Sequence, residues 1–240
     1  MIIANYRTIF HEIAILLIIV LLVCLIKGML LEIIMRLLAI DSSILEDYSV
    51  SRQLMGQFLD HWQHDYPESE IIYRDLNVQT VNHLSSELIK AKQKSVAELS
   101  PELKSELELS EQLVVEFLSA DEIIIAAPMY NFAIPTQLKS WIDRVLVAGR
   151  TFKYTEQGVI GLAADKKVTI ISTRGNHYSS DEVMRAKDFQ ENYLKTIFNF
   201  IGVTQINIIR AEGLHLGESM KTKAITVAEQ EIKALFLNAA

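Results

Sequence analysis

The sequence predicts a doubly wound α/β domain built on a five-stranded parallel sheet. Five short apolar runs have the length and composition of strands buried on both faces, and helical segments separate them. Such an alternation gives a parallel sheet with right-handed crossovers and helices on both faces. The 240 residues are enough for one domain of this kind with its own core, but too few for two ordinary domains.

Each predicted strand is a short apolar run that ends at a polar segment or at proline. The clearest is a run of isoleucine and alanine that Pro128 follows. Because the runs lack a polar alternation, we expect both faces of the sheet to be covered. The predicted strands, in chain order, are residues 35–40, 70–76, 123–127, 167–173 and 205–210.

The predicted helices follow from apolar residues at helical spacing and from proline at helix starts. In the first of them, Leu54, Phe58 and Trp62 recur every four residues. Pro101 and Pro135 stand at expected first turns, where a missing amide costs nothing. The predicted helices are residues 49–64, a helix that begins near residue 101 within the polar segment 77–119, and residues 135–147, 188–201 and 219–237.

Residues 1–34 form an apolar N-terminal extension in front of the domain at residues 35–240. Its uninterrupted apolar part, residues 13–26, is shorter than the ~20 residues of a usual membrane helix. No small-x-small site follows it, which disfavours a cleaved signal peptide. We favour a misassigned start codon, because a bilayer helix running straight into a buried strand would force the sheet against the membrane. A membrane segment at residues 13–34, or an accessory helix, remains the alternative.

Composition excludes several classes of function. The formal charge of −7 and the lack of a Lys/Arg stripe argue against nucleic acid or anionic lipid as the main partner. The single cysteine, Cys24, lies in the extension, so one chain can build neither a disulfide nor a cysteine metal cluster. We expect no metal, a cytoplasmic location, and membrane contact only if the extension is part of the working protein.

The ligand site of such a sheet lies at the carboxyl ends of its strands, near the point where strand order reverses. Three loops of this sequence meet that condition. We call residues 41–51 the first loop, residues 128–132 the second loop and residues 173–176 the third loop.

The first loop carries Ser43, Ser49 and Ser51 just ahead of a predicted helix. Hydroxyls and free amides at a helix N-terminus can hold a phosphate without a basic side chain, which suits an acidic protein. The alternative is that Ser49 or Ser51 is only a helix N-cap, a common role for serine at this position.

The second loop offers Met129, Tyr130 and Phe132 to line an aromatic ring, and Asn131 to pair with ring nitrogens or carbonyls. A hydrophobic plug at the sheet edge is the alternative. In the third loop, Gly175 permits close backbone approach and Arg174 would add a fixed positive charge that stabilises a reduced, anionic ring. The alternative there is a turn with a surface arginine.

Beyond these single residues, the chain resembles the FMN-dependent NADH-azoreductases and NADH:quinone oxidoreductases, which have a flavodoxin-like fold. The segment APMYNFAIPTQLKSWIDRV, followed by AGRTFKYTEQGVIGL, carries the resemblance at residues 127–162. It continues in DSSILEDYSVSRQL at residues 41–54, in STRGNHY at residues 172–178 and in AEG at residues 211–213. It covers essentially residue 35 to the C-terminus and none of the first 34 residues.

The resemblance implies a set of FMN contacts and a dimer. Family members are homodimers with the flavin at the subunit interface, and Phe152 and Tyr154 are the candidates for completing that pocket. The chain departs from the family at Asn176, where a second glycine is common. The implied contacts are Ser43, Ser49, Val50 and Ser51 for the phosphate, Met129, Tyr130, Asn131 and Phe132 beside the isoalloxazine, and Thr173, Arg174, Gly175 and Asn176 at its polar edge.

The implied activity is the transfer of two electrons from NADH, through FMN, to quinones or to aromatic azo compounds. Because the chemistry belongs to the flavin, no catalytic side chain is predicted. An electron carrier that binds FMN but does not oxidise NADH is the alternative. A metal-dependent hydrolase built on His64 and Asp65 is disfavoured, since neighbouring helical residues point about 100° apart.

Overall fold

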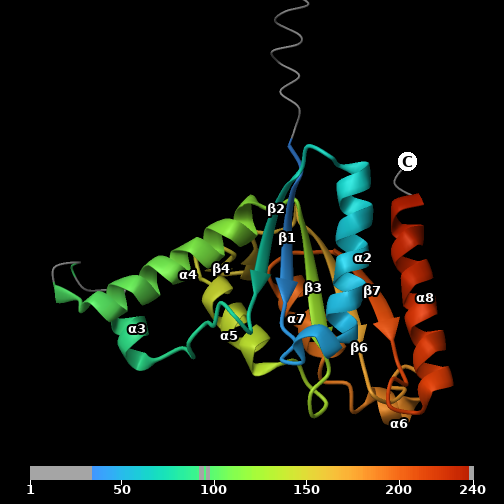
Figure 1. The fold of residues 1–240 in the computed structure, drawn as a ribbon. Coiled ribbons are helices and arrows are strands. Elements are labelled where there is room, and N and C mark those ends of the chain that lie inside the picture. Colours follow the sequence, from blue (N-terminus) through green and yellow to red (C-terminus); the bar gives the residue numbers. More distant parts are fainter. Residues whose placement is uncertain (1–33, 92–94, 96–97, 238–240) are drawn as a thin grey trace, which may run out of the picture. The chain divides into compact units, whose positions relative to one another are not determined.

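A five-stranded sheet forms the centre of the domain, and all of its strand pairs are parallel (Figure 1). The computed structural model describes residues 34–91, 95 and 98–237, and residues Met35–Ala240 form one compact unit. The sheet order β2-β1-β3-β6-β7 reverses direction between β1 and β3, as in flavodoxin-like sheets. The predicted fold class is confirmed. The strands are β1 (Arg36–Asp41), β2 (Glu70–Asp75), β3 (Glu122–Pro128), β6 (Lys167–Thr173) and β7 (Gln205–Ala211).

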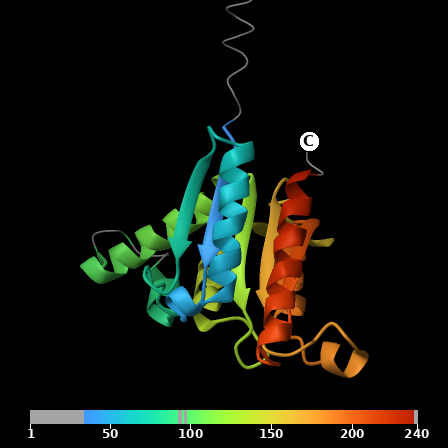
Figure 2. The same cartoon turned by 45° about the vertical axis from the view of Figure 1, so that its right-hand side comes forward.

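Helices cover both faces of this sheet. Helices α2 (Val50–Asp65) and α8 (Glu218–Leu237) lie side by side on one face (Figure 2). Helices α4 (Pro101–Ser119), α5 (Thr136–Val145) and α7 (Glu191–Phe200) pack on the other. Successive residues of a strand therefore enter different cores: Leu37 packs with α2 and α8, while Leu38 packs with α4 and α5.

The helix signals in the sequence correspond to local structure. Ser49 is the N-cap of α2, and Leu54, Phe58 and Trp62 are its buried stripe. Helix α4 begins at Pro101, as predicted. Pro135 is the N-cap of α5, one position before the first turn in which we expected it. The remaining helical segments are short: η1 (Glu46–Tyr48), α3 (Ser86–Ala91) and α6 (Glu182–Arg185).

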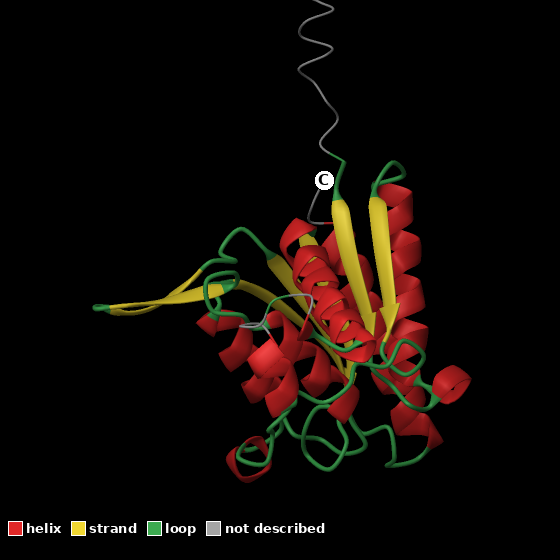
Figure 3. Ribbon diagram, turned by 90° about the vertical axis from the view of Figure 1, so that its left-hand side faces the viewer, coloured by secondary structure: helices red, strands yellow, loops and turns green. Residues whose placement is uncertain are grey.

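A β-hairpin that the strand analysis did not predict projects from the domain (Figure 3). Its antiparallel strands are β4 (Phe152–Thr155) and β5 (Gly158–Gly161). The base of the hairpin packs closely against the end of α7. A Cβ added to Gly161 would lie only 2.1 Å from the carbonyl carbon of Ile201. This contact fixes the direction in which the hairpin leaves the domain.

Within residues 34–91 and 98–237, none of the helices combines the length and the apolar character that crossing a bilayer requires. Residues 13–34, for which a membrane segment was the alternative interpretation, lie outside the described residues except for Ile34, which is half-exposed.

Candidate functional site

A cavity of about 190 Å³ lies at the carboxyl ends of the strands and brings the first, second and third loops together. Eight predicted site residues line it: Ser43, Ser49, Val50, Met129, Tyr130, Thr173, Arg174 and Gly175. Six further lining residues were not predicted: Leu45, Tyr48, Pro128, Leu214, His215 and Lys221. The predicted residues Ser51, Asn131, Phe132, Asn176, Phe152 and Tyr154 are not among those that line this cavity.

The first loop presents buried hydroxyls at the N-terminus of α2. Ser49 Oγ accepts a hydrogen bond from the Arg52 amide (3.3 Å) and contacts Ser51 Oγ at 3.0 Å. Ser49 therefore is an N-cap and a cavity residue at once, so the two readings of this serine are compatible. The amides of Val50 and Ser51 belong to the first helical turn, where no acceptor exists within the helix. Hydroxyls and free amides together form an anion site at a helix N-terminus.

Arg52 links the first loop to the end of β2. Its guanidinium donates to both carboxylate oxygens of Asp75 (2.5 and 2.7 Å) and to the Ser43 carbonyl (3.0 Å). Burial would raise the pKa of Asp75, but the hydrogen bonds from Arg52 lower it below its usual range. This ion pair was not predicted from the sequence.

Asp41 lies beside that pair and is 1% exposed. Its Oδ2 accepts a short hydrogen bond from the Tyr73 hydroxyl, while its Oδ1 has no hydrogen-bond partner within the described part of the chain. Burial raises the pKa of Asp41, and the Tyr73 hydrogen bond and the Arg52 charge offset that only in part. The pKa of Tyr73 is raised by burial and by its bond to this carboxylate.

The second loop is a tight, strained turn. Backbone hydrogen bonds run in both directions between Tyr130 and Ala133, at 2.9 and 3.1 Å. The two central residues, Asn131 and Phe132, have positive φ angles of 48° and 71°. Asparagine tolerates this conformation, but an aromatic residue rarely adopts it. The strain therefore coincides with the residues that the sequence places beside an aromatic ligand.

Direct hydrogen bonds join the three loops into one unit. Tyr130 Oη lies 3.1 Å from Ser43 Oγ and accepts from the Ile44 amide, which ties the second loop to the first. The Met129 amide donates to the Thr173 carbonyl at 2.9 Å, which ties the second loop to the third. The cavity walls are thus held relative to one another before any ligand arrives.

Arg174 is buried and paired with acidic side chains. Its side chain is 1% exposed and forms ion pairs with three carboxylates: Asp188 (2.9 Å), Glu191 (2.5 Å) and Glu212 (3.0 Å). The predicted fixed charge is thus shared with three carboxylates, and the alternative, a surface arginine, is wrong. The guanidinium is paired with acidic groups in the protein interior. As part of the third loop, Arg174 also lines the cavity.

Two of these carboxylates stay ionised despite their burial. Burial would raise the pKa of Glu191, but hydrogen bonds from Arg210 and the charge of Arg174 lower it below its usual range. Burial would likewise raise the pKa of Glu212. Hydrogen bonds from Ser179 and from the Tyr178 amide, with the charge of Arg174, lower it instead.

The third loop pairs along its length with the segment that follows β7. The Arg174 amide donates to the Ala211 carbonyl (2.9 Å), and the His215 amide donates to the Gly175 carbonyl (3.0 Å). Asn176 accepts at its carbonyl from the Gly213 amide (3.2 Å), and its Oδ1 accepts from the amide of the next residue (2.8 Å). The amide side chain that replaces a family glycine thus closes a local turn.

Phe152 and Tyr154 lie on the hairpin. Phe152 is 8% exposed and packs against Phe200 with ring centroids 4.8 Å apart, so its ring belongs to the core. Tyr154 is 73% exposed and contacts Phe152 edge to face. Of the two predicted pocket residues, only Tyr154 presents its side chain to the surroundings.

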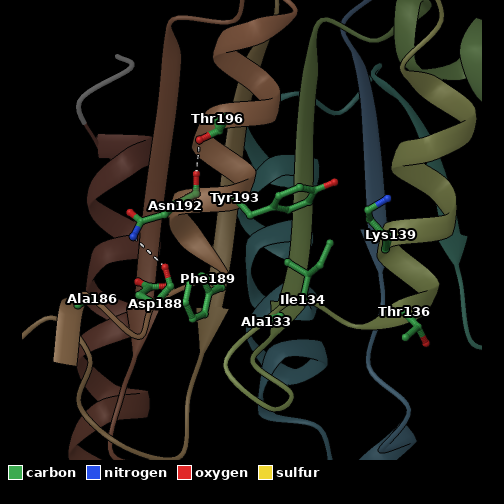
Figure 4. Close-up of a pocket in the computed structure, with 10 residues that line it drawn as sticks. All are labelled: Ala133, Ile134, Thr136, Lys139, Ala186, Asp188, Phe189, Asn192, Tyr193 and Thr196. Carbon is green, nitrogen blue, oxygen red and sulfur yellow. Dashed lines mark hydrogen bonds between the residues drawn. The ribbon is translucent and has the colours of Figure 1, made fainter. Parts of the chain in front are cut away.

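A second, larger cavity of about 640 Å³ lies between α5 and α7 (Figure 4). Ile134, Phe189 and Tyr193 give it an apolar lining, and Lys139 and Asp188 add charge at its sides. Asn192 donates to the Asp188 carbonyl at 2.8 Å across one wall. This cavity was not predicted from the sequence, because its walls come from segments about 50 residues apart.

No metal cluster was found in the described ranges, which contain no group of three His, Cys, Asp or Glu side chains that could hold an ion. His64 Nδ1 contacts Asp65 Oδ1 at 2.8 Å at the exposed end of α2.

The sheet order and a cavity at the switch point between β1 and β3 define a flavodoxin-like protein. A family model described as flavodoxin-like fold matches residues 35–236, and the chain belongs to this family. A Legionella pneumophila protein named FMN-dependent NADH:quinone oxidoreductase is 50% identical over 201 residues, which cover 84% of this chain and 97% of that protein. One of the same name from Azospirillum brasilense is 49% identical over 202 residues, with the same coverage.

Among solved structures, an FMN-dependent NADH-azoreductase from Bacillus anthracis in complex with FMN has a TM-score of 0.79 and 27% identity. The alignment covers 86% of this chain and all of that one. The resemblance stated from the sequence is confirmed by these relatives.

Proposed function

We propose that this chain is an FMN-dependent enzyme that uses NADH to reduce quinones by two electrons and to cleave aromatic azo bonds. The observation that carries the proposal is the cavity that joins the anion site of the first loop to the flat, apolar surface of Met129 and Tyr130. A phosphorylated cofactor with an aromatic ring requires this combination. Relatives of about 50% identity that bear the corresponding name support it.

The donor set of the site fits FMN. Ser43, Ser49, Val50 and Ser51 would hold the phosphate through hydroxyls and helix amides, which need no buried lysine or arginine. When bound, FMN supplies the hydride and electron chemistry. The chain's own tasks are to hold the phosphate end and to present an open face to alternating flat substrates. The second loop, Met129 to Phe132, would lie beside the ring, and Thr173 to Asn176 would border its polar edge.

A homodimer completes this proposal. The cavity of about 190 Å³ is smaller than the roughly 300–1,000 Å³ that encloses a ligand of this size, so the ring needs cover from elsewhere. Tyr154, exposed on a projecting hairpin, is placed to reach a neighbouring subunit. Exposed apolar side chains near the site, Tyr48 at 92%, Phe189 at 62% and Phe132 at 48%, agree with a surface that is covered in an assembly.

We place the activity in residues 35–240 and the enzyme in the cytoplasm. The family model starts its match at residue 35, where the apolar extension ends. Membrane anchoring through residues 13–34 remains the alternative, and fractionation of cells that express the full chain into membrane and supernatant distinguishes the two.

The test is to purify the full chain and, separately, residues 35–240, and to record the flavin spectrum and the oxidation of NADH with and without benzoquinone. We expect a yellow protein whose NADH oxidation accelerates when the quinone is present. A protein that binds FMN but leaves NADH unoxidised would be the electron carrier. A folded, colourless protein that FMN cannot reconstitute would refute the proposal.

A further inference from the structure

Two basic residues, His215 and Lys221, line the cavity together with the first loop. His215 lies in the segment after β7, and Lys221 lies in the first turn of α8. Helices α2 and α8 pack side by side and start at the same end of the sheet (Figure 1). The start of α8 therefore faces the same cavity as the N-terminus of α2, where Ser49 and Val50 lie.

The charge of Lys221 is not offset by the protein. In the part of the chain that the structure describes, no carboxylate oxygen lies within 4.0 Å of Lys221 Nζ or of the ring nitrogens of His215. The arginines of the site differ sharply: Arg52 is paired with Asp75, and Arg174 with three carboxylates. Lys221 is thus the cation that this cavity leaves available to an anion.

His215 is held in place by its backbone and by the third loop. Its amide donates to the Gly175 carbonyl at 3.0 Å. Its ring lies against Gly175 so closely that a Cβ added there would come within 2.6 Å of His215 Nδ1. The ring therefore needs little further ordering to meet a ligand between the first and third loops.

We propose that Lys221, with the His215 ring beside it as a hydrogen-bonding group, forms a cationic wall of the phosphate subsite, so that the chain selects a phosphorylated flavin over an unphosphorylated one. This inference rests on the proposed function. The first loop supplies only neutral donors, and Lys221 supplies the charge. A hydrogen bond between a lysine ammonium and a phosphate oxygen is stronger than one between neutral groups.

The experiment measures the dissociation constants of FMN and of riboflavin, which lacks the phosphate, on the full-length apoprotein by flavin fluorescence. We expect Lys221→Ala to weaken FMN binding about 10-fold and to leave riboflavin binding unchanged. His215→Gln should weaken FMN binding about threefold. Lys223→Ala is the matched control, because Lys223 lies on the same helix but lines a different cavity, beside Glu231. It should change neither constant. Added salt should weaken FMN binding more in the unaltered chain than in Lys221→Ala.

Two outcomes would overturn the inference while leaving the proposed function intact. Equal weakening of FMN and riboflavin by Lys221→Ala would mean that Lys221 only supports the fold of the cavity. Unchanged FMN binding with a raised KM for NADH would assign the two side chains to the phosphates of the electron donor. If the unaltered chain binds neither flavin, the proposed function itself fails, and the inference fails with it.

Discussion

The first and third loops are both held by an arginine, but the two arginines work in different surroundings. Arg52, below the first loop, is 18% exposed and pairs with Asp75, while neighbouring Asp41 keeps one oxygen without a partner among the described residues. Arg174, in the third loop, is 1% exposed and pairs with three carboxylates, one of which, Glu191, also pairs with Arg210 and Lys195. The buried carboxylates of the first loop thus have too little positive charge beside them, whereas the buried carboxylates of the third loop are well compensated by cations. The two loops should respond to charge removal with opposite signs.

The largest effect should come from Arg174→Met. Removing this guanidinium leaves Asp188, Glu191 and Glu212 facing one another inside the protein, and loss of one partner of a buried ion pair costs about 3–5 kcal/mol. Urea unfolding of the full-length chain measures the loss. Arg150→Met is the control, because the pair of Arg150 with Glu111 is half-exposed and should contribute less than about 1 kcal/mol.

Equal losses in these two variants would show that the buried cluster adds nothing to the fold. If Arg174→Met does not fold, Arg174→Lys retains the charge without the planar fork of donors. It should fold and lose about 1–3 kcal/mol.

Glu191→Gln should destabilise the chain by about 2 kcal/mol at pH 7 and show the pH dependence of the third-loop cluster. The folded-state pKa of Glu191 is lowered, so its ionised form stabilises the fold above its unfolded value of 4.5. That stabilisation disappears as the pH falls through the lowered pKa. Unfolding free energies at several pH values should therefore converge for the variant and the unaltered chain in acid. A difference that is constant from pH 7 to the acid limit would contradict this account.

Asp41→Asn should act in the opposite direction. The folded-state pKa of Asp41 is raised, so its contribution is favourable below the unfolded value of 3.8 and is lost as the pH rises through the raised value. An uncharged side chain removes that cost and still accepts from Tyr73. We expect a gain of about 1 kcal/mol at pH 7 that vanishes in acid, measured by the same unfolding series. A loss of stability at pH 7 would show that Arg52 compensates this carboxylate fully.

This contrast between the loops marks the limit of what the sequence could predict. The five strands were recognisable because parallel strands buried on both faces are continuous apolar runs. The position of the site followed from where such strands end. The role of Arg174 could not be predicted, because its carboxylate partners lie 14 to 38 residues further along the chain and meet it only after folding. The hairpin was missed because each of its strands has only four residues, and two of the four residues of β5 are glycines.

One signal in the sequence was available and went unused. Asp41 directly follows the first predicted strand and Asp75 lies near the end of the second, and the register of β1 and β2 places these two aspartates side by side. Two carboxylates at adjacent strand ends require a cation between them or a raised pKa. Arg52, one turn into the helix that follows the first strand, was the nearest candidate. The supporting network of the first loop could therefore be predicted from adjacent strand ends, whereas that of the third loop could not.

The smallest effect should come from the second loop, which has a strained turn in place of an ion-pair network. In Phe132→Gly, glycine adopts the positive φ of 71° freely, and relief of about 1 kcal/mol exceeds the loss of the edge-to-face contact with Tyr178, about 0.5 kcal/mol. Because glycine also costs roughly 0.5–1 kcal/mol of backbone entropy, we expect a net change close to zero together with a higher KM for the quinone. Phe189→Gly is the control: Phe189 is also exposed, but its φ is not positive. Its replacement by glycine should destabilise the chain through backbone entropy. If both variants lose stability, the turn stores no strain, and the second loop is held by its packing like the rest of the site.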